Sequence, residues 1–452
     1  MRRKMVLCSA IPRYGAILGG EQVKIAFAIN GTRGDVQPAV VLAAALTERG
    51  HEVSVGVPPN LVEFARGCGL EATALGPDTR THMKMVTEAR AEAGRNPLRQ
   101  IRAVAQLRDL GYSELITDLG DIVDGADAIV TGFTTEQITL AYAESAGVPL
   151  ISLHHAPVRR NTVHGPLPSL HLGGAHTVRT QWWLFDRLFG LMTRRRDALL
   201  RERLGCAPAL RSPAAQLAAA PGIEIQAYDP LFAVRNDPVW DADAALRPRP
   251  VVGFLELPAR LRLGLDEMHS TEELSDWFDA GDPPVYVGFG SMPVRDPAKM
   301  IDAAVTATRR LGRRLLLCTG WNDLPTDSLA GEDIRIVRAV DHDAVFGRCA
   351  AIVHHGGAGT TAAAVRSGTP SVICWYGSDQ PFWGRELERL GVGATLPARR
   401  LDADRLTDAL TRVLDLRGRH VATQLITGDV ALAQAVEHIE TTVSSPRVGQ
   451  SR

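Results

Sequence analysis

Residues 24–57 read KIAFAINGTRGDVQPAVVLAAALTERGHEVSVGV, and in this stretch a long apolar run stands between two short ones. Lys24–Ile29 and Val53–Val57 have the length of buried strands, and Val36–Arg49 between them has the length of a helix. Proline is tolerated in the first turn of a helix, which is where Pro38 falls. A strand, a helix and a second strand form a βαβ unit, so the stretch predicts an α/β fold with parallel strands.

The same alternation continues through both halves of the chain. In the first half it comprises a strand at Ala128–Thr131, a helix at Glu136–Ser145 and a strand at Pro149–His154. In the second half the expected strands are Val285–Phe289, Arg314–Cys318, Ile334–Val337, Ala351–His355 and Ser371–Trp375, and the expected helices are Pro297–Leu311, Gly359–Arg366 and Gln380–Leu390. The two series predict two doubly wound, Rossmann-like domains that face each other across a cleft.

Breaks in this rhythm mark the expected domain boundaries. Residues 1–22 are expected to be a disordered leader, because their apolar stretch is interrupted too early for a secretory signal. The first domain is expected at 23–235 and the second at 284–440. Residues 236–283 contain several prolines and little regular period, which favours a linker, and 441–452 is expected to be a tail.

The composition excludes several classes of protein. The chain has 452 residues, of which 45% are hydrophobic and 22% charged, as in folded globular proteins and unlike disordered ones. The 50 basic and 51 acidic residues give a net charge of −1, so nucleic acid is not expected as a partner. The six cysteines form no C-x-x-C pair, which favours free thiols in a reducing cytoplasm. The longest apolar run, Ala39–Leu46, is too short to cross a bilayer.

A glycine-rich segment stands between an expected strand and an expected helix. Residues 353–361 read VHHGGAGTT. Small residues let backbone N–H groups approach an anion, and the helix N-terminus adds a partial positive charge, so the segment predicts a site for a diphosphate. Its spacing matches neither a P-loop nor a G-x-G-x-x-G dinucleotide loop. The alternative is a tight turn with a buried histidine.

Two further motifs carry carboxylates at the carboxyl ends of strands, where ligands bind in open α/β sheets. Residues 375–383 read WYGSDQPFW, in which Asp379 and Gln380 suit the neighbouring hydroxyls of a sugar. Residues 31–38 read GTRGDVQP, in which Asp35, with an ordinary pKa of about 3.9, is an ionised base directed into the cleft. For each aspartate the alternative is a helix N-cap.

Together, residues 31–38 and 354–383 resemble the nucleotide-sugar-dependent glycosyltransferases of the GT-B fold, in the branch of sterol glucosyltransferases and bacterial antibiotic glycosyltransferases. The two-domain rhythm extends the resemblance over residues 23–440, with its weakest part at 75–220. The resemblance implies that the first domain binds the acceptor and the second binds the nucleotide sugar.

The resemblance also implies a role for individual residues. Asp35 would be the general base that deprotonates the acceptor hydroxyl. Residues implied or expected on the acceptor side are Thr32, Arg33, His154, His155, Trp182 and Phe185. Residues implied to bind the donor are Ser291, Trp321, Val340, His355, Gly357, Gly359, Thr360, Asp379 and Gln380. His355 and the helix N-terminus would stabilise the leaving diphosphate in place of a metal, and direct displacement would invert the anomeric carbon.

Some of these residues have a second interpretation. Trp182, Phe185, Phe189 and Met192 form one stripe of a helix, which is typical either of core packing or of a wall of an apolar acceptor pocket. His154 and His155 end a strand, where a purely structural role is common. Three D-x-D pairs, at 241/243, 341/343 and 402/404, match a metal-binding pattern, but none follows a convincing strand of the nucleotide-binding domain, so no metal site is predicted.

The sequence therefore predicts an inverting, metal-independent hexosyltransferase without a bound cofactor. It would move a hexose from a UDP- or TDP-sugar to a hydroxyl of a bulky apolar acceptor, such as a polyketide, ansamycin or sterol-like molecule. A cytoplasmic monomer or homodimer is expected, with no integral membrane association, and with peripheral membrane contact in the case of a lipid acceptor. The alternatives are a nucleotide-sugar epimerase and a non-catalytic nucleotide-sugar binding protein.

Overall fold

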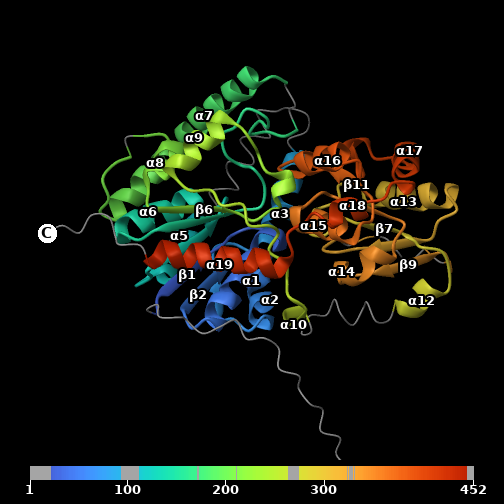
Figure 1. Ribbon diagram of the computed structural model, residues 1–452, viewed down its shortest axis with the longest axis horizontal. Coiled ribbons are helices and arrows are strands. Elements are labelled where there is room, and N and C mark those ends of the chain that lie inside the picture. Colours follow the sequence, from blue (N-terminus) through green and yellow to red (C-terminus); the bar gives the residue numbers. More distant parts are fainter. Residues whose placement is uncertain are drawn as a thin grey trace, which may run out of the picture.

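The computed structural model describes residues 22–92, 111–169, 173–209, 211–262, 274–322, 324, 329 and 331–444 (Figure 1). Of the predicted leader only Gln22 falls within these residues, and the predicted tail is described only as far as Ser444. The described residues form two parallel sheets of six strands each. The predicted α/β architecture with two Rossmann-like domains is therefore confirmed.

The first sheet has the strand order β3-β2-β1-β4-β5-β6, the order of a classic dinucleotide-binding fold. Its strands are buried runs of mostly small and apolar residues, as expected for a sheet covered by helices on both faces. The strands are β1 (Lys24–Ala28), β2 (Glu52–Val57), β3 (Ala72–Ala74), β4 (Ala128–Gly132), β5 (Leu150–His154) and β6 (Gly222–Gln226). The helices are α1 (Arg33–Glu48), α2 (Val62–Gly67), α3 (Thr79–Glu92), α5 (Tyr112–Val123), α6 (Glu136–Ala146), α7 (Ala175–Arg203) and α8 (Pro213–Ala219).

The second sheet has the order β12-β11-β10-β7-β8-β9, which is the same arrangement counted from its own first strand. The strands are β7 (Val285–Gly288), β8 (Leu315–Cys318), β9 (Ile334–Val337), β10 (Ala351–His354), β11 (Ser371–Trp375) and β12 (Gly393–Pro397). The helices are α13 (Pro297–Arg310), α14 (His342–Val345), α15 (Ala358–Ser367), α16 (Gln380–Arg389), α17 (Ala403–Leu414), α18 (Arg419–Ala422) and α19 (Gly428–Ser444). The linker range contains α9 (Pro238–Leu246), α10 (Ala259–Arg262) and α12 (Ser275–Asp279).

Three edge strands, β3, β6 and β12, were not expected from the sequence. β3 has only three residues, and β6 includes Glu224, which is buried in the structure. Glu224 is tolerated because Arg159 and Arg249 hold its carboxylate at 3.0 and 2.6 Å. These arginines are distant in the sequence, so no local pattern shows that a strand with this charge can be buried.

Helix α19 returns to the first domain, where Figure 1 shows it alongside α1. Its apolar side chains Leu432, Val436 and Ile439 are part of the core that also includes β1 and α1. Arg49, at the end of α1, donates to the Glu440 carboxylate at 2.5 and 2.7 Å. The predicted second-domain range 284–440 therefore includes residues that pack in the first domain.

An aromatic cluster joins the two domains. Trp383 of α16 is fully buried, and its ring lies 5.3 Å from that of Phe232 and 5.9 Å from that of Phe254, both of which precede the second sheet. His164 packs edge-on against Phe382, with 4.8 Å between ring centroids. The start of α16 is thus held by residues from both sides of the cleft described next.

Candidate active site

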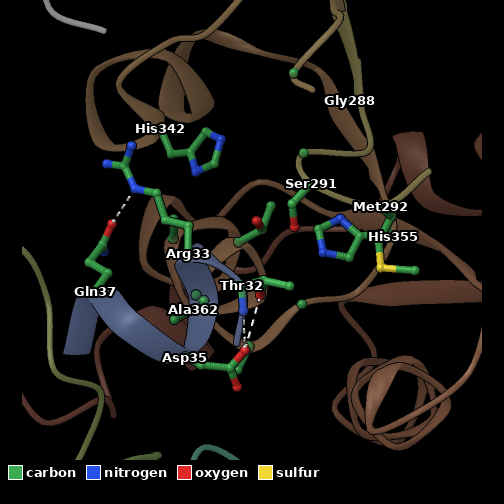
Figure 2. Close-up of a pocket in the computed structure, with 18 of the residues that line it drawn as sticks. Thr32, Arg33, Asp35, Gln37, Gly288, Ser291, Met292, His342, His355 and Ala362 are labelled. Carbon is green, nitrogen blue, oxygen red and sulfur yellow. Dashed lines mark hydrogen bonds between the residues drawn. The ribbon is translucent and has the colours of Figure 1, made fainter. Parts of the chain in front are cut away.

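A cleft of about 950 Å³ separates the domains, and residues of both domains line it (Figure 2). This volume is typical of a small-molecule site, and the position outside the carboxyl ends of the strands is the usual one in α/β sheets. The predicted residues that line it are Thr32, Arg33, Asp35, His155, Ser291, Trp321, Val340, His355, Gly357, Gly359, Thr360, Asp379 and Gln380.

The first-domain side of the cleft is formed by the start of α1. Thr32 is the N-cap residue, and Asp35 occupies the third helical position, so the two close a capping box. Asp35 Oδ2 accepts hydrogen bonds from the Thr32 backbone N at 2.8 Å and from Thr32 Oγ1 at 3.2 Å (Figure 2). Both bonds are made to one oxygen, so the carboxylate is oriented while Oδ1 is left for a ligand.

The Asp35 carboxyl differs from an ordinary aspartate. Burial in the cleft raises its pKa to about 6, with a further contribution from the negative charge of Asp379, while the Thr32 hydrogen bonds oppose the rise. The pKa of Asp35 therefore lies above the ordinary aspartate value of about 3.9. At pH 7 the group is still mostly ionised, and a base with a pKa near neutrality accepts a proton more readily than an ordinary carboxylate.

Gly31 leaves the space that this carboxylate fills. A β-carbon at Gly31 would lie 2.4 Å from Asp35 Oδ2 and 2.6 Å from its Cγ. Any side chain at this position would therefore displace the carboxylate from its capping-box geometry. Gly34, in the first turn of α1, has no such constraint, because its β-carbon would meet only Thr32 Oγ1, at 3.7 Å.

The second-domain side is formed by the turn from β10 into α15. Gly356 has a φ of +90°, and its β-carbon would lie 2.6 Å from Ile373 Cγ2, so the sharp turn requires glycine. His354 is fully buried, and its Nδ1 accepts a hydrogen bond from the Gly356 N at 3.2 Å. His354 thus supports the turn, while His355 lines the cleft at the N-terminus of α15.

The His355 ring is closely surrounded and has a nitrogen that is unpaired in the described part of the chain. A β-carbon at Gly357 would lie 2.5 Å from His355 Nε2, so glycine is needed there for the close approach of the ring, whereas one at Gly290 would make an ordinary contact with Cε1 at 3.4 Å. Its Nδ1 is buried and has no hydrogen-bond partner among the described residues. Burial, with help from His342, lowers the pKa of His355 to about 4, so the ring is neutral at pH 7 and carries one N–H donor. Burying an unpaired polar atom is costly, which favours occupation by a polar ligand.

Asp379 and Gln380 begin α16 beside this turn. The Asp379 Oδ2 accepts a hydrogen bond from Trp383 Nε1 at 2.8 Å, which ties it to the aromatic cluster. Burial raises the pKa of Asp379. Gln380 Oε1 accepts hydrogen bonds from the backbone N of Tyr376 at 2.7 Å and of Gly377 at 3.3 Å, so the side chain holds the preceding loop.

The chain is similar in sequence to known glycosyltransferases. Residues 25–164 match the model of the glycosyltransferase family 28 N-terminal domain, and residues 317–441 match that of the erythromycin biosynthesis protein CIII-like C-terminal domain. An uncharacterized glycosyltransferase of Mycobacterium leprae is 34% identical, covering 92% of this chain and 96% of that one. The vancomycin aglycone glucosyltransferase of Amycolatopsis orientalis is 31% identical, covering 94% and 100%. The chain belongs to the glycosyltransferases.

Two other comparisons locate this glycosyltransferase more closely. A sterol 3-beta-glucosyltransferase of Arabidopsis thaliana is 30% identical over 87% of this chain and 61% of that one. The crystal structure of the glycosyltransferase VinC in complex with DTDP superimposes with a TM-score of 0.61 at 20% identity, covering 93% and 99% of the chains. The predicted GT-B fold and the predicted branch of sterol and antibiotic glycosyltransferases are both confirmed.

Three residues expected on the acceptor side of this glycosyltransferase are not among those that line the cleft, namely His154, Trp182 and Phe185. Trp182 is a buried residue of α7, and its Nε1 donates a hydrogen bond to the His164 carbonyl at 2.8 Å. Phe185 packs edge-on against Trp182 and stacks on Phe189. Of this stripe Trp182 is buried, Phe185 and Phe189 are half-buried, and Met192 is exposed.

His154 belongs to a buried polar network. Its Nε2 lies 3.1 Å from Glu136 Oε1, and its Nδ1 lies 3.2 Å from Gln226 Nε2. Arg159 pairs with both Glu136 and Glu224, and burial lowers the pKa of His154. The neighbouring His155 lies in the cleft, where burial lowers its pKa to about 4.

A set of ion pairs on the linker side of the cleft was not expected from the sequence. Arg366 pairs with Glu256 at 3.1 Å and with Asp343 at 2.7 Å, and Arg262 pairs with Asp341 at 3.1 Å. The D-x-D pair 341/343 is therefore neutralised by arginines, and Asp243 pairs with Arg160. Asp402 is the N-cap of α17. No cluster of three or more metal-ligating side chains occurs in the part of the chain that is described.

Proposed function

We propose that this glycosyltransferase transfers a hexose from a UDP- or TDP-sugar to a hydroxyl of a bulky apolar acceptor, with inversion at the anomeric carbon and without a metal. One observation carries the proposal. The Asp35 carboxylate and the N-terminus of α15, with His355, line the same cleft from opposite domains. A base on one side and an anion site on the other suit a direct displacement at a carbon between them.

The proposed roles follow from the atoms that face the cleft. The backbone N–H groups at the start of α15 and the neutral His355 would hold the diphosphate and stabilise its charge as the bond to the sugar breaks. Asp379 and the Gln380 amide would bind sugar hydroxyls. Asp35 would remove the proton from the acceptor hydroxyl as its oxygen attacks, so no group of the protein bonds to the sugar.

The apolar character of the acceptor is supported by other residues that line the cleft, namely Leu61, Phe64, Met83, Phe254, Leu255 and Leu257. Two relatives are named for a bulky acceptor, a vancomycin aglycone and a sterol. The complex of VinC with DTDP supports a nucleoside diphosphate on the donor side.

The test is incubation of the enzyme with a panel of UDP- and TDP-hexoses and apolar acceptors, followed by mass spectrometry for a hexose adduct and NMR for its anomeric configuration. We expect a product with inverted configuration in the presence of EDTA. Asp35→Asn should lower turnover by about 10²-fold or more while leaving UDP affinity unchanged, because only the base is lost.

The outcomes separate the alternatives. Conversion of the donor sugar without any acceptor would indicate an epimerase, and nucleotide-sugar binding without turnover would indicate a binding protein. Retained configuration would contradict direct displacement, and abolition of activity by EDTA would contradict the metal-independent mechanism.

A further inference from the structure

The outer face of α7 is unusually apolar for a solvent-exposed helix. Six large apolar side chains of this helix are between 48% and 69% exposed: Trp183, Leu184, Leu188, Leu191, Met192 and Leu199. Leu184, Leu188 and Leu191 are spaced four and three residues apart, so they lie on one face of the helix. Figure 1 shows α7 on the outer side of the first domain. An exposed apolar face of this kind marks a site of interaction.

The same face carries positive charge. Arg187, Arg194 and Arg195 are exposed and lie three or four residues from Leu191, so they surround it on the helix surface. The Arg187 guanidinium lies 5.5 Å from the centre of the Trp183 ring, which places cation and aromatic group together. The outer face of α7 thus combines leucines, a tryptophan and arginines.

The two aspartates of α7, Asp186 and Asp197, do not lie on this exposed face. Asp186 is half-buried and accepts a hydrogen bond from the Ala214 N at 3.3 Å. Asp197 is buried and paired with Arg201 at 3.0 Å. As far as Arg201, therefore, the outer face presents positive but not negative side chains, and the one exposed acid of α7 is Glu202 in its last turn.

We propose that the outer face of α7 docks the enzyme on an anionic lipid bilayer, with the helix axis parallel to the membrane surface. Apolar side chains of such a helix enter the boundary between headgroups and acyl chains, while arginines pair with lipid phosphates and tryptophan prefers the interface. A second copy of this chain is a poor occupant, because a two-fold interface would bring the same arginines face to face.

This proposal does not depend on the identity of the acceptor or on Asp35. No helix among the described residues has the length and apolar character needed to cross a membrane. The docking face is a separate surface from the cleft, since none of its residues lines the cleft.

Flotation of the intact protein with vesicles tests the proposal. Vesicles of phosphatidylglycerol and phosphatidylcholine in equal parts should carry the wild-type protein, and vesicles of phosphatidylcholine alone should carry about tenfold less or none. Arg194→Glu/Arg195→Glu should reduce binding to the anionic vesicles by at least about tenfold, because two attractive charges are replaced by two repulsive ones. Leu191→Ser should reduce it by about tenfold.

Matched controls use exposed residues elsewhere. Arg400→Glu/Arg412→Glu changes the charge by the same amount in the second domain, and Val430→Ser removes a 47% exposed apolar side chain from α19. Both controls should float like the wild type, and all variants should keep the wild-type melting temperature. Absence of wild-type flotation, equal binding to the two kinds of vesicle, or equal loss in variants and controls would overturn the proposal. So would a wild-type dimer, detected by light scattering, that Leu191→Ser dissociates.

Discussion

Asp35 combines a structural and a chemical role in one carboxylate. One oxygen completes the capping box of α1, and the group as a whole has a raised pKa because it is buried beside Asp379. The start of α1 therefore orients the carboxylate, whereas burial and the neighbouring Asp379 weaken its acidity against the opposing effect of the Thr32 hydrogen bonds.

The raised pKa of Asp35 predicts the pH dependence of the reaction. Because the base acts only when deprotonated, kcat/KM should be constant above pH 7 and fall about tenfold per pH unit below pH 6. His355 remains neutral over this range, since its pKa is lowered to about 4. A pH profile of kcat/KM, with UDP affinity measured at each pH as control, checks this. A break near pH 4 would contradict the perturbed value.

Linkage predicts that the ionised Asp35 destabilises the fold. A carboxyl whose pKa is raised in the folded state contributes stability at low pH that is lost as the pH rises through about 6. Asp35→Asn should therefore raise the free energy of unfolding at pH 7.5 by about 1 kcal/mol, after allowance for solvent at this partly open site, and have no stabilising effect at pH 4. Urea denaturation at the two pH values measures the difference. Equal effects at both would show that the charge is not the cause.

Gly31, before α1, and Gly34, in its first turn, provide a matched pair of substitutions. Gly31→Ala should lower kcat by about 10²-fold, because the new β-carbon would occupy the position of the Asp35 carboxylate. Gly34→Ala should leave kcat within about twofold, since its β-carbon meets only an ordinary contact. Kinetics of both variants check the prediction, and similar kcat values in the two would show that the carboxylate is not held as described.

At the scale of elements, α16 connects the cleft to the contact between the domains. Trp383 is buried among aromatic side chains from both domains, and its Nε1 holds Asp379. The packing of the domains thus positions a carboxylate in the cleft.

Removal of that indole N–H should affect the donor sugar. Trp383→Phe should raise KM for the nucleotide sugar by about tenfold, because a hydrogen bond to a charged group is worth about 1.5 to 3 kcal/mol, and should leave the Kd of UDP alone unchanged. Trp277→Phe is the control. It removes a comparable buried bond, from Trp277 Nε1 to the Glu332 carbonyl at 3.0 Å, on a residue that does not line the cleft. An equal rise in KM for both variants would indicate a general loss of stability.

The regular strands and the glycine-rich turn could be predicted because they depend on neighbouring residues. The apolar runs of β1, β4 and β10 and the glycines before α15 are local patterns. The strand β6 was missed because its Glu224 is neutralised by distant arginines. For the same reason the sequence placed His154 beside the cleft, whereas its partners Glu136 and Arg159 lie in a buried network.

For the whole molecule, the decisive contact that the sequence did not reveal is the return of α19 to the first domain. The helix α19 was not expected from the sequence, and no local pattern shows which core its apolar face joins. In the structure that face joins α1, and Glu440 contacts both Arg49 and His51, the latter at 3.2 Å.

Loss of this anchor should weaken the whole fold. Glu440→Ala should lower the free energy of unfolding by about 1 to 2 kcal/mol, because it leaves Arg49 and His51 partly buried without their carboxylate. Glu437→Ala, at an exposed position of the same helix, should change it by less than about 0.5 kcal/mol. Chemical denaturation compares the two, and equal values would mean that the Glu440 contacts contribute nothing.

Because α19 packs in the first domain, the polypeptide passes between the two domains twice, once after β6 and once after α18. Two connections can act as a hinge. Rotation about the line that joins them can widen or narrow the gap, whereas twisting or sliding of one lobe on the other would strain both connections. The two connections therefore favour opening and closing of the cleft over movements that would change which residues face each other across it.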